Sequence, residues 1–137
     1  MTDNMARSAA RSVRTRQRIQ ELIYETPTLP SQTVGDKTGC DLLFKAENFQ
    51  LTGSFKMRGA ASKMTALEPG QKLITASSGN HGIASSRAAS LTGQDLTVVL
   101  PETVARAKLE KIQSFGVEII LHGAESGIAE THAQSLA

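Results

Sequence analysis

From residue 41 onward, short apolar runs alternate with helical patterns, and this alternation constrains the fold more than any other feature of the chain. Strands are predicted at residues 42–44, 72–75, 96–100 and 117–121. Apolar residues at helical spacing predict helices at residues 56–67, 82–91, 103–114 and 124–137. Such an alternation is typical of parallel βαβ units. The sequence therefore predicts an α/β fold, in which an open, parallel, twisted sheet has flanking helices.

The spacing of the apolar residues also predicts which side chains are buried. The run Leu96–Leu100 is rich in β-branched residues, so we expect it to be buried on both faces. The residues expected on the inward faces of the helices are Met57, Ala60, Ala61, Met64, Leu67, Ala84, Ala88, Leu91, Ala105, Leu109, Ile112 and Phe115. Cys40 is the only cysteine, which excludes an intramolecular disulfide, and it is expected to be a small buried or half-buried side chain.

The length and charge of the chain exclude several classes of protein. A chain of 137 residues supports one domain at most. The 15 Lys and Arg against 13 Asp and Glu leave a net charge of +2, which makes no electrostatic case for binding nucleic acid. No apolar run is long enough to span a membrane. We therefore expect a cytoplasmic protein without a nucleic-acid or membrane partner.

The first eighteen residues are rich in arginine and contain a single acid, Asp3. Starts of this composition resemble organelle transit peptides. The favoured interpretation is an exposed N-terminal helix that leads into Ile19, Leu22 and Ile23, with its first dozen residues frayed.

Ligands of parallel sheets sit at the carboxyl ends of strands, which directs attention to the loops at residues 48–56, 76–82 and 101–104. The first of these loops ends at Lys56, which is predicted to stand in the first turn of a helix. The positive end of a helix and partial burial both disfavour an ammonium group there and favour the free amine. Lys56 is thus suited to nucleophilic or Schiff-base chemistry, but a plain surface lysine fits the local pattern equally well.

The second loop reads Ala76-Ser77-Ser78-Gly79-Asn80-His81-Gly82 and joins a strand to a helix. Backbone N–H groups at such a helix start bind carboxylate or phosphate, although an ordinary polar turn is the simpler interpretation. The chain contains no known nucleotide-binding, zinc-protease or serine-hydrolase motif, no metal site is predicted, and Asp and Glu are scattered mainly over predicted helix surfaces.

The two loops together resemble a known family. The run from Lys45 to Ala60, KAENFQLTGSFKMRGA, is similar to the K-x-E-x-x-Q-x-T-G-S-F-K-x-R-G-A segment of the threonine/serine dehydratase and serine racemase group. These are fold-type II enzymes that depend on pyridoxal 5′-phosphate. The run from Ser77 to Gly82 matches the S-x-G-N-H-G element of the same group at the expected distance. The resemblance covers roughly residues 17–137.

The resemblance implies a role for each matching residue. Lys56 would hold the cofactor as a Schiff base and remove the substrate's α-proton. Phe55 would pack against the pyridine ring, and Asn80 would hydrogen-bond the 3′-oxygen. Ser78 is the candidate second acid/base on the opposite face. The residues around the substrate carboxylate would be Ser77, Ser78, Gly79, Asn80 and His81.

The resemblance also implies an organisation in which residues 1–73 open a large cofactor domain and residues 74–137 form a small α/β domain. The family's phosphate-binding loop and ring-nitrogen contact come later in its chains. We therefore expect this chain to be an N-terminal portion with weak or no cofactor binding alone, and a homo-oligomer when full length. The implied function is a dehydratase that converts a hydroxy amino acid to a 2-oxo acid and ammonia. The alternatives are a serine racemase, a threonine synthase, a diaminopropionate lyase or a non-catalytic remnant.

Overall fold

The computed structural model describes residues 2–137, and of residues 2 and 3 it describes the backbone alone. The helices are α1 (Thr2–Ile19), α2 (Gln32–Thr38), α3 (Lys56–Met64), α4 (Asn80–Thr92), α5 (Arg106–Gln113) and α6 (Ser126–Leu136), with 3₁₀ helices η1 (Gln20–Leu22) and η2 (Glu47–Phe49). The strands are β1 (Thr28–Pro30), β2 (Leu43–Lys45), β3 (Lys72–Ala76), β4 (Asp95–Leu100) and β5 (Glu118–Leu121).

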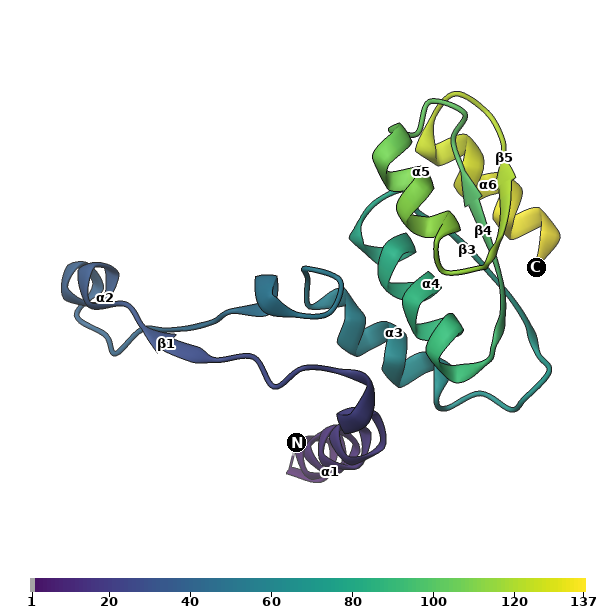
Figure 1. The fold of residues 1–137 in the computed structure, drawn as a ribbon. Coiled ribbons are helices and arrows are strands. Elements are labelled where there is room, and N and C mark those ends of the chain that lie inside the picture. Colours follow the sequence, from purple (N-terminus) through teal and green to yellow (C-terminus); the bar gives the residue numbers. More distant parts are fainter. Residues whose placement is uncertain (1) are drawn as a thin grey trace.

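Strands β3, β4 and β5 form a parallel sheet in that order, with β4 in the centre. Leu73 lies beside Leu96, and Val98 lies beside Ile119. Helices cover both faces of this sheet (Figure 1). The predicted α/β fold with an open parallel sheet and flanking helices is thereby confirmed.

The side chains of β4 point alternately into two clusters. Leu96, Val98 and Leu100 pack with α3, α4 and α5, whereas Val99 packs with Ala129 and Ala133 of α6. The predicted burial of this strand on both faces is confirmed, because Val98, Val99 and Leu100 are all fully buried. The parallel sheet and the helices packed on its two faces therefore form one compact unit, which we call the body (residues 56–137).

A second region, the arm (residues 28–45), projects away from the body (Figure 1). It consists of an antiparallel ribbon of β1 and β2 with α2 between the two strands. The strand predicted near residues 42–44 exists, but it pairs antiparallel with β1 instead of joining the parallel sheet. Every residue of β1 and β2 is exposed, because no other layer covers the ribbon.

Helix α1 runs from Thr2 to Ile19 and residues 4–14 are exposed, which confirms the predicted exposed N-terminal helix. Its last turn carries Arg16 and Arg18, which suit the negative end of a helix. Arg18 donates hydrogen bonds to Thr65 Oγ1 at 2.9 Å and to the Ser62 carbonyl at 3.2 Å. These bonds tie the end of α1 to the end of α3. No helix among residues 2–137 is long and apolar enough to cross a membrane.

The structure corrects three expectations about burial. Leu91 is exposed because it lies in the last turn of α4, one residue before the last. Ala105 is exposed because α5 begins only at Arg106, three residues later than the predicted start at 103. Cys40 is exposed because it lies on the projecting arm, where its thiol contacts only the neighbouring Thr38 carbonyl among the contacts of the described residues.

Candidate active site

The first candidate loop places Lys56 at the beginning of α3, as predicted. The preceding turn passes through Gly53, whose φ of +74° suits glycine. Phe55 stands next to the lysine with 59% of its surface exposed, and the Lys56 Nζ atom lies 4.7 Å from the centre of its ring. The Lys56 amine and the Phe55 ring therefore lie side by side at the start of α3.

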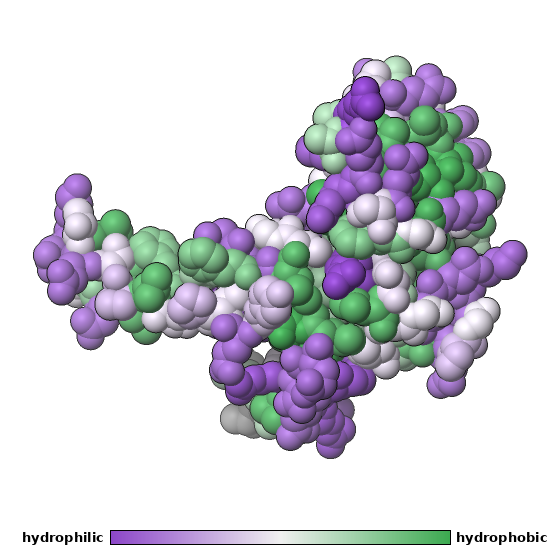
Figure 2. All heavy atoms as spheres, viewed as in Figure 1, coloured by the Kyte–Doolittle hydropathy of each residue, from purple (hydrophilic) through white to green (hydrophobic). Residues whose placement is uncertain are grey.

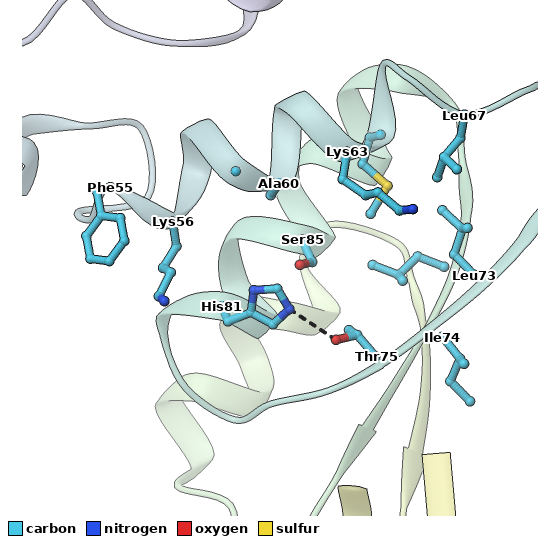
Figure 3. A pocket seen from close by; sticks show the side chains of 13 residues that line it. Phe55, Lys56, Ala60, Lys63, Leu67, Leu73, Ile74, Thr75, His81 and Ser85 are labelled. Atoms are coloured by element: carbon cyan, nitrogen blue, oxygen red, sulfur yellow. Dashed lines mark hydrogen bonds between the residues drawn. The ribbon is translucent and has the colours of Figure 1, made fainter. Parts of the chain in front are cut away.

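Lys56 and Phe55 line a cavity of about 500 Å³ between α3, α4 and β3. Figure 3 shows the Lys56 side chain extending from α3 toward His81, which comes from the first turn of α4. The remaining walls are largely apolar and include Met64, Leu73 and Leu96. This cavity brings the chemistry-bearing ends of both predicted loops to one place.

The second loop ends at the N-terminus of α4, with Gly79 as the N-cap residue in an extended conformation. Ser77 accepts a hydrogen bond on its Oγ from the Gly79 N–H at 3.2 Å, which tightens the turn. A Cβ on Gly82 would lie 1.9 Å from the Ser77 carbonyl oxygen, so only glycine fits this close approach. The first N–H groups of α4 have no partner within the helix, as at any helix start. They are available to an anion.

The side chain of His81 is exposed and hydrogen-bonds Thr75 across 3.2 Å between Nε2 and Oγ1. This contact spans the turn from the end of β3 to the first turn of α4 (Figure 3). His81 thus has a positioning contact inside the same loop, besides its place in the cavity wall.

The predicted site residues fall into two groups. Phe55, Lys56 and His81 line the cavity. The others, Ser77, Ser78, Gly79 and Asn80, form the turn that leads to His81 and do not line the cavity. Their roles toward cofactor and substrate stay predictions.

The structure adds a cluster to which the sequence analysis assigned no role. Arg58 donates from Nε to Glu47 Oε2 at 2.8 Å and from Nη2 to Glu47 Oε1 at 2.7 Å, a two-pronged ion pair. The same Nη2 donates to Thr26 Oγ1 at 3.1 Å, and Thr26 in turn donates to Glu47. Glu47 is thus held by hydrogen bonds to α3 and to Thr26.

The pair is largely shielded, since the Glu47 side chain is 17% exposed and that of Arg58 is 31% exposed. The Arg58 guanidinium, the Thr26 hydroxyl and the Lys45 ammonium lower the pKa of Glu47 from 4.5 to about 2, against an opposing effect of burial. The pair also raises the pKa of Arg58. These contacts therefore favour the ionised form of Glu47.

Gln50 is buried beside η2 and bonds to backbone groups. Its Oε1 accepts hydrogen bonds from the N–H groups of Tyr24 at 2.8 Å and Leu51 at 3.1 Å, and its Nε2 donates to the Tyr24 carbonyl at 2.9 Å. Glu47, Gln50 and Arg58 are named positions of the motif in the Lys45–Ala60 run, and that motif was the available signal for them.

The comparisons with known proteins agree with this geometry. The sequence profile of the pyridoxal-phosphate dependent enzymes matches residues 19–137. The chain belongs to this family. The cofactor of the family is pyridoxal phosphate, as predicted.

Family members with similar sequences include a putative threonine dehydratase of Sinorhizobium fredii, 34% identical over 90% of this chain and 38% of the relative. The serine racemase of Homo sapiens is 41% identical over 74% of this chain and 32% of the relative. The processed form of threonine deaminase isoform 2 from Solanum lycopersicum has a TM-score of 0.87 at 26% identity, over 99% of this chain and 40% of that one. The chain thus spans about a third of the length of these curated relatives.

The residues present fit the aldehyde and the ring of the family's cofactor. Among the described residues, no carboxylate pairs with Lys56, so its amine is open to an aldehyde. Phe55 offers an exposed aromatic face beside that amine. Thr52 Oγ1 and Ser54 Oγ are buried in the same loop without a hydrogen-bond partner among the described residues. This donor set suits an aromatic aldehyde that also carries polar groups.

Proposed function

We propose that this chain carries part of the active site of a dehydratase, an ammonia-lyase that acts on a hydroxy amino acid such as threonine or serine. The observation that carries the proposal is that Lys56 and His81, which follows the Ser77–Asn80 turn in the first turn of α4, line one cavity. The similarity to threonine dehydratases supports it. Bound pyridoxal phosphate supplies the electron sink that stabilises negative charge at the substrate's α-carbon.

In this proposal Lys56 would hold the cofactor covalently until the substrate amine displaces it, and the freed Nζ would then accept the α-proton of the substrate. Phe55 packs against the cofactor ring, and Asn80 orients the ring through a hydrogen bond. The start of α4 holds the substrate carboxylate through N–H groups near Gly79, Asn80 and His81, where the helix dipole favours an anion. The substrate loses its β-hydroxyl as water, and hydrolysis of the resulting enamine yields the 2-oxo acid and ammonia.

The test combines spectroscopy with a product assay on the longest natural protein that contains this chain. With pyridoxal phosphate we expect a visible absorption band and 2-oxo acid from at least one member of a panel of hydroxy amino acids. Lys56→Ala should abolish both, whereas Lys63→Ala, which removes an amine from the same cavity wall, should leave the band in place. A band that persists in Lys56→Ala would refute the assignment.

Racemisation is the second candidate, since a serine racemase is 41% identical to this chain over 108 residues. In that case Ser78 would exchange a proton with the α-carbon on the face opposite Lys56. The two activities are told apart by analysing the products of L-serine. Pyruvate supports the dehydratase, and D-serine that disappears in Ser78→Ala supports the racemase.

The chain has one cysteine, and it is exposed and free. Exposed thiols persist in reducing compartments, which supports the cytoplasmic location that we include in this proposal.

A further inference from the structure

We propose that Glu47, Arg58 and Gln50 are positioning residues that set the placement of Lys56 relative to Phe55 and the cavity. We call these three side chains the clamp. The inference rests on the proposed function, because it concerns the lysine that would hold the cofactor.

The clamp joins three separate segments of the chain. Arg58 belongs to α3, Glu47 belongs to η2, and both bond to Thr26 in the segment that enters the arm. Lys45 adds a further bond, from its Nζ to the Thr26 carbonyl at 2.7 Å. The loop that leads to Lys56 is thus fastened at both of its ends, by Glu47 and Gln50 before it and by Arg58 after it.

The clamp acts on the side of α3 opposite to the lysine. Successive residues of an α-helix are about 100° apart, so Arg58 points roughly 200° away from Lys56 around the axis of α3. Met57 and Ala60 are buried between these two directions. A two-pronged bond at Arg58 therefore restrains rotation of the helix about its axis, and that rotation sets where the Lys56 amine points. A guanidinium with two donors on one carboxylate restrains orientation better than a single contact.

Gln50 restrains the other side of the loop. Its amide makes three hydrogen bonds to the backbone of Tyr24 and Leu51, one of which is a donor bond to a carbonyl. A carboxylate in place of the amide would face the Tyr24 carbonyl without a proton to donate. Gln50→Glu is therefore an isosteric change that breaks the clamp without removing volume.

The test measures the reactivity of individual lysines in the 137-residue chain. The chain is incubated with pyridoxal phosphate, reduced with borohydride at timed intervals and mapped by peptide mass spectrometry. Lys63 is the internal reference, because it lies seven residues after Lys56 on the same helix and lines the same cavity. Covalent trapping needs no tight binding of the cofactor.

In the wild type we expect Lys56 to be labelled faster than Lys63. In Glu47→Gln the ratio of the two rates should fall on the order of tenfold, because a displaced amine loses its favourable placement. Arg58→Lys should give an intermediate ratio, since it keeps the charge but only one contact. The matched control is Glu110→Gln, which breaks the exposed Arg106–Glu110 pair of 2.7 Å and should leave the ratio unchanged.

The outcomes separate the two hypotheses. A wild type without preference for Lys56 would refute the proposed function. A preference that survives in both Glu47→Gln and Gln50→Glu, even with lowered unfolding temperatures, would show that the clamp only stabilises the fold and would overturn the inference. If Glu47→Gln does not fold, Gln50→Glu and Arg58→Lys carry the same test, with circular dichroism as the check on folding.

Discussion

The body and the arm use similar secondary structure but differ in what covers it. In the body, Val98 and Leu100 are fully buried between helices and sheet. In the arm, Leu43 is 61% exposed and Phe44 is 53% exposed, and apolar residues lie open along its surface in Figure 2. The body therefore has a hydrophobic core of its own, whereas the arm is held mainly by backbone pairing. The candidate chemistry lies at the junction of the two, at the start of α3.

The largest effect should come from deleting a core side chain of the body. Leu100→Ala should lower the free energy of unfolding by about 2–5 kcal/mol. Leu43→Ala, the same change on the arm, should cost less than about 0.5 kcal/mol. Urea denaturation of both variants measures the difference. Equal losses would show that the arm has a core of its own and would break the comparison.

Gly82→Ala should give the next largest effect, because the new methyl group would meet the Ser77 carbonyl at 1.9 Å. We expect a loss of about 3 kcal/mol, at the upper end of overpacking, together with a displaced turn. Gly127→Ala is the matched control in the first turn of α6, where nothing lies within 4 Å of the added methyl group. That control should be neutral or slightly stabilising. Similar free energies of unfolding for Gly82→Ala and Gly127→Ala would contradict the close approach of Gly82 to the Ser77 carbonyl.

The Glu47→Gln variant tests the Glu47–Arg58 ion pair at the junction, through the pH dependence of the free energy of unfolding. A carboxyl with a lowered pKa stabilises the fold above its unfolded value near 4.5, and this stabilisation is lost as the pH falls toward about 2. We expect a cost of roughly 1–2 kcal/mol at neutral pH, less than the full shift implies because the pair is partly exposed. The difference between wild type and variant should shrink between pH 4.5 and 2. If the difference in the free energy of unfolding between wild type and Glu47→Gln stayed constant across that pH range, the ion pair would be contradicted.

The smallest effect on stability should come from Cys40→Ser, with a change below about 0.5 kcal/mol. Because the thiol is exposed on the arm, it should react with a thiol reagent in the native chain nearly as fast as in urea. A thiol protected in the native chain would show that the arm is covered.

The body was predicted well from the sequence because its signals are local. The helical spacing of Met57, Ala60, Ala61 and Met64 marks a buried face, and all four residues are buried in α3. The β-branched run of β4 and the left-handed Gly93 after α4 are equally local signals. These patterns determine element type and burial together, so the parallel sheet follows from them.

The arm and the clamp could not be predicted in the same way because they depend on pairing between distant segments. Thr28 pairs with Lys45, and Glu47 pairs with Arg58. The spacing of apolar residues in the sequence predicts neither contact. Cys40 was expected to be at least half buried on residue type alone, but no layer covers the arm. At the candidate site the motif contains Phe55 and Lys56 and also the clamp residues, whereas the bonds between Glu47 and Arg58 became visible only in three dimensions.

The most direct test of the account is the distribution of a trapped pyridoxyl label over the seven lysines of the chain. After incubation with pyridoxal phosphate and reduction with borohydride, peptide mapping gives the extent of modification at each lysine. The account predicts that Lys56, at the start of α3 beside Phe55, carries the largest share at early times. A label spread evenly over the lysines, or concentrated on an exposed lysine such as Lys72, would contradict it.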